Sequence, residues 1–220
     1  MADSGTPEYS EAALEEMNEW IDEVHAALQS SGAPTYESTH VRPLDRQFRK
    51  EIGNYLKEQF SMDYTSILFF LDGMECVYHA EKDVFLVSYD SIQDLPGEFE
   101  LGVLAHEQGH RAGYTIIEDR LEPMHEEGEI SDKALKMLQS YFVSENFAER
   151  TKVAVGNSLG RDFTYWEELA DESPLIYRLR DRIGPEELVD TERDETLPEM
   201  MDSTEVLLQQ AANGEADWLN

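Results

Sequence analysis

Two histidines and a glutamate form the clearest chemical pattern in this chain. His106, Glu107 and His110 follow the pattern His-Glu-x-x-His. Helix residues four apart share a face, so the two imidazoles can bind one metal ion from adjacent turns. Glu107 would border the open coordination position, where a metal lowers the pKa of its water towards ~7 and the glutamate takes the proton. The pattern predicts one zinc ion per chain, with Glu107 as general base and then general acid.

The residues around this motif favour a packed helix. Leu101, Val103 and Leu104 precede it at the spacing of a buried face, and the small Gly109 and Ala112 permit close approach of another element. The alternative is a solvated helix of a very acidic protein, on which each histidine pairs with a glutamate. We prefer the metal interpretation, because it also accounts for the apolar and small residues.

A metal centre of this kind needs a third protein ligand. Gly113 matches the glycine of an extended pattern in which a third histidine follows closely, but residue 116 is isoleucine, which cannot be a ligand. The next candidates are Glu145 and Glu149, which stand four apart and can both face the histidine helix. They could also be two exposed acids among the 48 of the chain. His125 is a further candidate ligand, but we expect it in an exposed loop.

Residues 103–110, read together with ENFAER at residues 145–150, resemble the paired signatures of small gluzincins and HtpX-like peptidases. The resemblance covers about residues 99–155. It implies a zinc-dependent endopeptidase that cleaves a peptide or protein substrate. The metal ligands would be His106, His110 and Glu145, and Glu149 would hydrogen-bond a ligand histidine. The gap from His110 to Glu145 is longer than in thermolysin-like members and shorter than in HtpX-like ones.

Gluzincins also need a donor for the oxyanion that develops during hydrolysis. We predict Tyr141, because it lies one helical turn before Glu145. Tyr114, His125 and Tyr165 are the alternatives.

Hydrophobic periodicity predicts the elements that must position these side chains. We expect an α+β fold: a small three-stranded antiparallel sheet packed on the His-Glu-x-x-His helix and on a glutamate-bearing helix, with extra N- and C-terminal helices. Residues 115–130 should be irregular. A substrate could add a strand to residues 75–79 or 84–89. The expected strands are 66–71, 75–79 and 84–89, and the expected helices are 8–30, 44–60, 98–113, 132–155, 173–183 and 204–212.

Composition shifts along the chain suggest three regions. Residues 1–40 would form an N-terminal helix and linker, and residues 41–183 a zincin-like metallopeptidase domain. Residues 184–220 would form an acidic C-terminal extension. The terminal helices could cover the active-site cleft and keep the enzyme latent.

The chain is strongly acidic, with 48 Asp and Glu against 17 Lys and Arg among 220 residues, a net charge of −31. This field disfavours binding to nucleic acid. The acids are spread along the chain, which is typical of a solvated halophilic surface, whereas a nucleic-acid mimic would gather them in one block. The sequence lacks a signal peptide and a run of about 18 apolar residues, so we expect a cytoplasmic protein with no membrane contact.

Two other functions stay open at this point. The metal could stabilise a non-catalytic interaction module that no substrate enters. Alternatively, the protein could be a regulatory protease that cleaves one specific transcription factor. The sequence does not indicate an oligomeric state.

Overall fold

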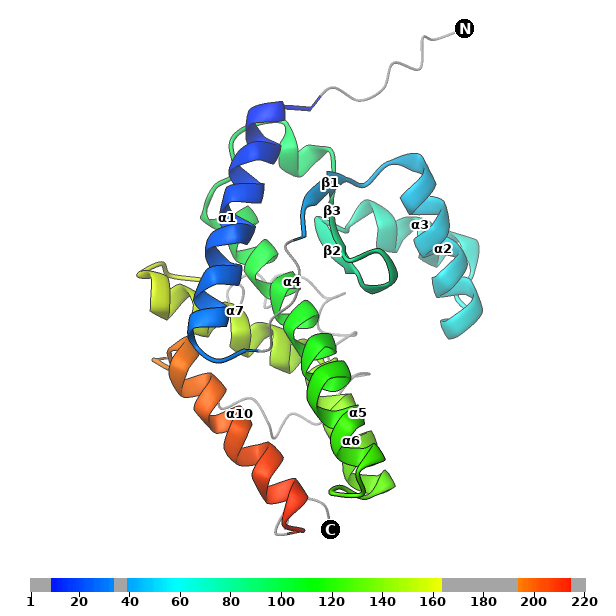
Figure 1. Ribbon diagram of the computed structural model, residues 1–220. Helices are drawn as coiled ribbons and strands as arrows, with labels where there is room; N and C mark the ends of the chain where they lie inside the picture. Colours follow the sequence, from blue (N-terminus) through cyan, green and yellow to red (C-terminus); the bar gives the residue numbers. More distant parts are fainter. Residues whose placement is uncertain (1–8, 34–38, 164–193, 215–220) are drawn as a thin grey trace, which may run out of the picture.

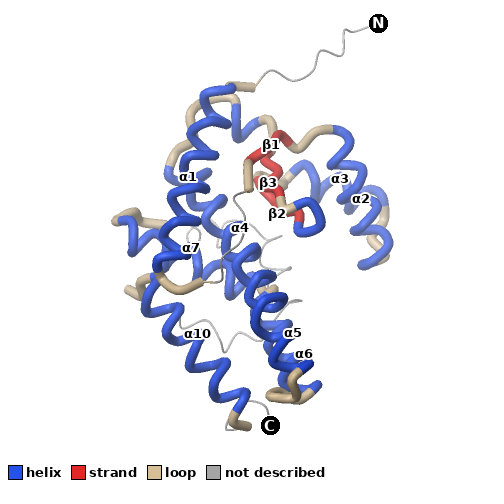
Figure 2. Tube along the Cα trace, in the orientation of Figure 1, coloured by secondary structure: helices blue, strands red, loops and turns tan. Residues whose placement is uncertain are grey.

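The computed structural model describes residues 9–33, 39–163 and 194–214. The described part is mainly helical, with a small three-stranded mixed sheet (Figures 1 and 2). The expected mixture of helices and a small sheet is confirmed. The main elements are α1 (Glu11–Ser30), β1 (Val41–Pro43), α2 (Arg46–Phe60), α3 (Tyr64–Asp72), β2 (Cys76–His79), β3 (Val84–Val87), α4 (Glu98–Ile116), the π-helical η3 (Ile117–Leu121), α5 (Glu122–Glu126), α6 (Asp132–Phe142), α7 (Glu145–Leu159) and α10 (Leu197–Ala212).

The expectation of an all-antiparallel sheet is wrong. The strand order is β1-β3-β2, and β2 pairs antiparallel with β3, with Cys76 beside Val87. On the other side of β3, the short strand β1 runs parallel to it, with Val41 beside Phe85. Strand β1 follows α1 in the chain and was not recognised in the sequence. The predicted strands at 75–79 and 84–89 are confirmed by β2 and β3.

The predicted strand at residues 66–71 is instead part of helix α3. The Asp63 side chain accepts hydrogen bonds from two backbone N–H groups of the first turn, which caps the helix. Within the apolar run, Ile67 and Leu71 are buried, and these stand four residues apart. A short apolar run fits a strand and a helix equally well, and the aspartate cap was the signal that separates them.

Strand β3 lies between two hydrophobic cores and is buried on both faces. Val84 and Leu86 belong to the smaller core under α2 and α3, whereas Phe85 and Val87 belong to the larger core with α1 and α4. Figure 2 shows the sheet between the α2–α3 pair and these longer helices. The sheet therefore backs α4, the helix that carries the histidine motif.

The terminal helices belong to the larger core. On α1, the indole nitrogen of Trp20 donates a 3.0 Å hydrogen bond to the carbonyl oxygen of Leu101 on α4. Leu197 and Leu208 of α10 are buried in the same core. Because α1 fills the core beneath α4, its removal would expose that core. The boundaries at residues 40 and 183 stay predictions.

Two glycines bring α4 into close contact with its neighbours, Gly109 with α7 and Gly113 with the last residue of α6. A Cβ atom at Gly109 would lie 2.7 Å from the Cα of Ala148, and one at Gly113 would lie 2.0 Å from the carbonyl oxygen of Phe142. No larger side chain fits at either position without movement of the backbone. The small residues of the motif therefore place α7 directly against α4.

The region between the two motifs differs from the expectation in two ways. Residues 132–155 form two helices, because α6 ends at Phe142 and Ser144 caps α7 through its hydroxyl group. Residues 115–130 are largely helical, since α4 continues through η3 into α5, with Ile117 and Leu121 buried. The predicted helix at 173–183 lies outside the described residues, and the one at 204–212 is the second half of α10.

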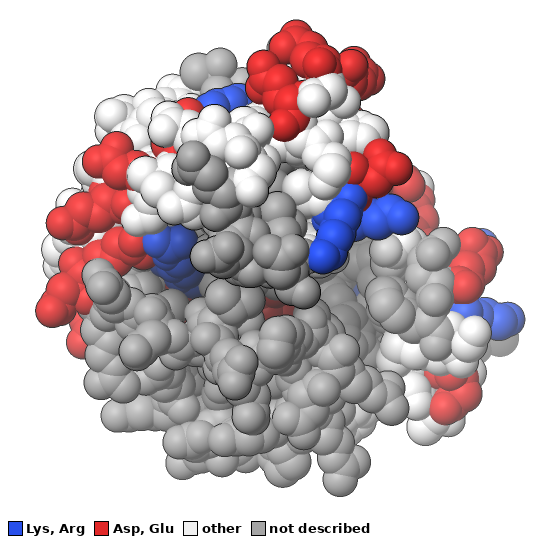
Figure 3. All heavy atoms as spheres, turned by 90° about the horizontal axis from the view of Figure 1, so that it is seen from below, with Lys and Arg blue, Asp and Glu red and all other residues white. Residues whose placement is uncertain are grey.

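None of the helices in the described ranges is long and apolar enough to span a membrane. Figure 3 shows one face of the molecule, on whose described part acidic side chains outnumber basic ones.

Candidate metal centre

Helices α4 and α7 bring two imidazoles and one carboxylate together. The Nε2 atom of His106 lies 3.0 Å from Oε2 of Glu145, and the Nε2 atom of His110 lies 3.5 Å from Oε1 of the same residue. The two imidazole rings are 5.1 Å apart between centroids. All three donor groups lie within 4.8 Å of one another. The three residues that the sequence predicted as ligands are thus neighbours.

The contacts of Glu145 with the two imidazoles are close to the spacing in a tetrahedral zinc site. Zinc bonds of 2.0–2.1 Å in a tetrahedron place neighbouring ligand atoms about 3.3 Å apart. One carboxylate oxygen of Glu145 lies 3.0 Å from His106, and the other lies 3.5 Å from His110. Two imidazoles and one carboxylate also form the ligand set of a catalytic zinc site that keeps one position open. The residues present therefore fit the metal that the sequence suggests.

The site is open on one side. The side chains of His106 and His110 are 14% and 15% exposed, whereas that of Glu145 is 51% exposed. Solvent can thus reach the centre at the Glu145 side chain.

Glu149 contacts the second ring nitrogen of His106. Its Oε2 atom lies 3.1 Å from Nδ1 of His106, the ring nitrogen that does not face Glu145. Burial alone would lower the pKa of His106, but the hydrogen bonds to Glu145 and Glu149 outweigh it and raise that pKa to about 10. In the metal-free centre His106 is therefore protonated at neutral pH.

A buried lysine lies beneath Glu149, and sequence reasoning missed it. Lys152 is fully buried, and its ammonium group pairs with Oε1 of Glu149. Burial would raise the pKa of Glu149, but the contacts with His106 and Lys152 lower it, so this carboxylate is ionised. The i, i+3 spacing on α7 was the only sequence signal for this pair.

Glu107 is half-buried and points to the sheet. Its Oε2 atom accepts a 2.6 Å hydrogen bond from the backbone N–H of Tyr78, on the outer edge of β2. The Oε1 atom has no hydrogen bond to any residue that the structure describes. Burial raises the pKa of Glu107, and the nearby His110 and His106 partly offset this rise. A raised carboxylate pKa suits a group that must accept and release a proton near neutral pH.

A second buried ion pair attaches the β2–β3 turn to α4. The guanidinium group of Arg111 donates to both carboxylate oxygens of Asp83, at 2.6 and 2.7 Å. The hydroxyl group of Tyr78 donates to the same aspartate at 2.9 Å. Arg111 follows the motif directly and has a side chain only 2% exposed. The edge strand and the glutamate of the motif are thus held in one arrangement.

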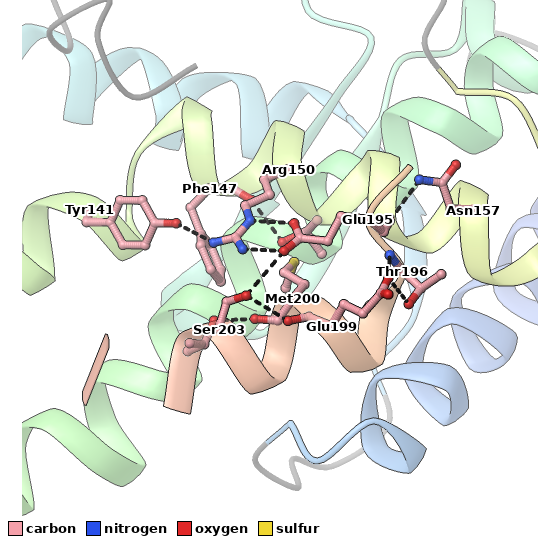
Figure 4. A network of polar contacts seen from close by, with 11 residues as sticks. Tyr141, Phe147, Arg150, Asn157, Glu195, Thr196, Glu199, Met200 and Ser203 are labelled. Carbon is pink, nitrogen blue, oxygen red and sulfur yellow. Dashed lines mark hydrogen bonds and ion pairs between the residues drawn. The ribbon is translucent and has the colours of Figure 1, made fainter. Parts of the chain in front are cut away.

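The hydroxyl group of Tyr141 belongs to a polar network with Arg150 and Glu195. This hydroxyl group accepts a 2.9 Å hydrogen bond from Arg150, which also pairs with both carboxylate oxygens of Glu195, just before α10 (Figure 4). Among the described residues, its hydroxyl group is therefore bonded to this network and not to the metal centre.

The alternatives to Tyr141 lie in different places. His125 pairs with Asp132 at 2.7 Å. Tyr114 is partly exposed, with its ring 6.2 Å from that of Tyr78 beside the edge strand. Tyr165 lies outside the described residues. Tyr114 is therefore the alternative that the structure places beside β2.

Comparison with protein-family models, with curated proteins and with solved structures finds no match for this chain. The resemblance to gluzincins therefore rests on the residues of the two motifs.

Proposed function

We propose that the protein is a zinc metallopeptidase of the gluzincin type, which hydrolyses peptide bonds in a peptide or protein substrate. The observation that carries this proposal is the convergence of one carboxylate, Glu145, on the imidazoles of His106 and His110 from a separate helix. The nearest ligands of the two motifs, His110 and Glu145, are separated by 34 intervening residues, so no local spacing brings them together. Their approach at ligand distances supports a shared role.

Each residue of the site has a distinct role in this proposal. Zinc, when bound, would supply a Lewis acid that polarises the substrate carbonyl and lowers the pKa of its water ligand. Glu107 would take a proton from that water and deliver it to the leaving amine. Glu149 would keep the Nδ1 proton on His106, so that Nε2 is the ligand atom. The exposed side of Glu145 would be the side from which substrate enters.

The sheet limits where an extended substrate can pair. Strand β3 is central, so residues 84–89 cannot accept a further strand, and this part of the expectation is wrong. Strand β2 is an edge strand, and the N–H group of Tyr78 points outward to Glu107. A substrate strand that bonds to this N–H group would displace the Glu107 carboxylate and leave it able to turn to the metal centre.

One observation favours a second candidate, a metal-stabilised module without catalysis. The Glu107 carboxylate already satisfies a backbone N–H group of β2, which is a structural use of this side chain. In that case Glu107 would fasten the edge strand to α4, and the metal would fasten α7 to α4. The two candidates differ in what Glu107 does when a peptide is present.

Replacement of Glu107 tests the two candidates. Glu107→Gln keeps a side chain of the same size but cannot accept the proton, so a peptidase should lose hydrolysis of an unfolded protein by about 100-fold or more. Zinc content, measured by elemental analysis of protein purified in molar salt, should stay at one per chain. Glu118→Gln, an exposed acid in η3, is the matched control. Persistent hydrolysis in Glu107→Gln would reject the proposed mechanism, and a wild type that binds no zinc would reject both candidates.

A further inference from the structure

Lys152 is the most unusual charged residue of α7, because its side chain is 0% exposed. Transfer of an ammonium group from water to a protein interior is costly unless a partner compensates it. Replacement of a buried ion pair by apolar residues is often neutral for stability or favourable. The stability of the helix packing alone therefore does not explain a lysine at this position.

The partner of Lys152 is a residue of the metal centre. Oε1 of Glu149 pairs with the ammonium group, and Oε2 of the same carboxylate lies 3.1 Å from Nδ1 of His106. Both oxygens of Glu149 are thus committed, one to the buried cation and one to the imidazole. Rotation of the carboxylate away from His106 would also break the ion pair.

The charges of the site point to the same role for the lysine. Glu145 contacts both histidines, Glu149 contacts His106, and Glu107 follows His106 directly on α4. When all three carboxylates are ionised, their three negative charges equal the positive charges of one divalent ion and one ammonium group. Without the lysine, the centre would keep an uncompensated negative charge in a partly buried place, which costs free energy even with zinc bound.

We propose that Lys152 is a positioning residue of the metal centre, which holds the carboxylate of Glu149 aimed at Nδ1 of His106. This role rests on the proposed zinc site. It accounts for a fully buried cation whose ammonium group pairs with Glu149. In this role the lysine acts through Glu149, so the effect of its removal on zinc binding should depend on whether that glutamate is present.

A double-mutant cycle on zinc affinity tests this dependence. The four proteins are the wild type, Lys152→Met, Glu149→Gln and the double variant, each stripped of metal and titrated against a chromophoric zinc chelator in molar KCl. Loss of the support to a ligand histidine weakens metal binding by about 10–100-fold, so we expect this loss in Lys152→Met. In the Glu149→Gln background, Lys152→Met should change zinc affinity by less than about threefold, because no carboxylate is left to position.

Two controls separate positioning from folding. Val155→Ala removes a fully buried side chain from the same helix, so it should lower the melting temperature but leave zinc affinity unchanged. Lys82→Met makes the same chemical change at an exposed ion pair with Glu51 and should alter neither quantity. The absorption spectrum of the Co²⁺-loaded protein gives a second readout, since the ligand field of Lys152→Met should resemble that of Glu149→Gln.

The possible results are distinct. Unchanged zinc affinity in Lys152→Met, or an equal loss with and without Glu149, would overturn the positioning role and leave the zinc site intact. Absence of zinc binding by the wild type would overturn the proposed function and this role together.

Discussion

The substitution Gly109→Ala adds one methyl group between α4 and α7 and tests whether their close contact is needed for the metal centre. A Cβ atom at Gly109 would lie 2.7 Å from Cα of Ala148 and 2.9 Å from its carbonyl oxygen. Carbon atoms in contact are about 3.5–4.0 Å apart, so Gly109→Ala would force the two helices about 1 Å apart. Gly109 directly precedes His110, and Ala148 directly precedes Glu149, so this displacement falls at the metal centre.

The change should reduce stability moderately and zinc binding strongly. Overpacking costs about 1–3 kcal/mol, and the better helix propensity of alanine offsets up to about 1 kcal/mol of this. We therefore expect a net loss of about 1–2 kcal/mol. Metal sites tolerate errors of about 0.2 Å in ligand distance, so a 1 Å displacement would remove Glu145 from the coordination sphere. Zinc binding of about 10–16 kcal/mol spread over four ligands amounts to about 3 kcal/mol per ligand, or about 100-fold in affinity.

Both quantities can be measured on the same purified protein. Thermal unfolding of the metal-free chain in molar KCl gives the change in stability, and competition with a chelator gives the zinc affinity. Gly53→Ala on α2 is the matched control, because its Cβ atom would meet only the ends of the Ile67 and Leu71 side chains, at 3.2 and 3.8 Å. This control should shift stability by less than about 0.5 kcal/mol and leave zinc affinity unchanged.

The reasoning would be refuted by a Gly109→Ala protein that binds zinc within about threefold of the wild type. The helix separation would then not control the centre. A loss of zinc affinity in Gly53→Ala of the same size would also refute it, since the effect would be general.

Three further predictions concern other parts of the site. His106 of the metal-free protein is protonated below a pKa of about 10, so zinc must displace this proton and binds more weakly as the pH falls. At pH 8, calorimetry in buffers of different ionisation enthalpy should detect about one released proton, whereas a value below about 0.2 would contradict the raised pKa. Arg150→Met removes the cation that pairs with Glu195, whose side chain is 10% exposed. It should lower the free energy of unfolding by about 3 kcal/mol, measured by thermal unfolding. A decrease below about 0.5 kcal/mol would show that this pair does not hold α10. Tyr141→Phe should lower the free energy of unfolding by about 1 kcal/mol and leave kcat unchanged, because the Tyr141 hydroxyl group accepts a hydrogen bond from Arg150. A 100-fold lower kcat with zinc still bound would instead support the predicted role of Tyr141 as oxyanion donor.

Much of the fold could be read from local patterns, and the failures have identifiable causes. The helices with clear periodicity, such as α1 and α4, were predicted, since their apolar faces repeat over many turns. The run at 66–71 was misassigned because its five apolar residues contain too little periodicity to separate strand from helix, and the Asp63 cap was overlooked. The three-residue strand β1 was missed because it carries no alternation of its own and exists only by pairing with β3.

The sequence by itself determined the parts of the site that one helix can define. The spacing of His106 and His110 places both imidazoles on one face of α4, and the spacing of Glu145 and Glu149 does the same on α7, because helix geometry is local. Which of the 48 acids would approach the histidines was not local information. Tertiary structure decided it, through the close contact of the two helices at Gly109.

The same distinction applies to the groups around the ligands. Lys152 beneath Glu149 and the N–H group of Tyr78 at Glu107 became visible only in three dimensions. Burial converts an ordinary lysine into a costly cation that needs a partner, and only the packed interior specifies burial. Backbone donors such as that of Tyr78 exist at every residue except proline, so the sequence cannot indicate which one a side chain will reach. Sheet pairing and helix packing decide this, since both depend on contacts between segments distant in the chain.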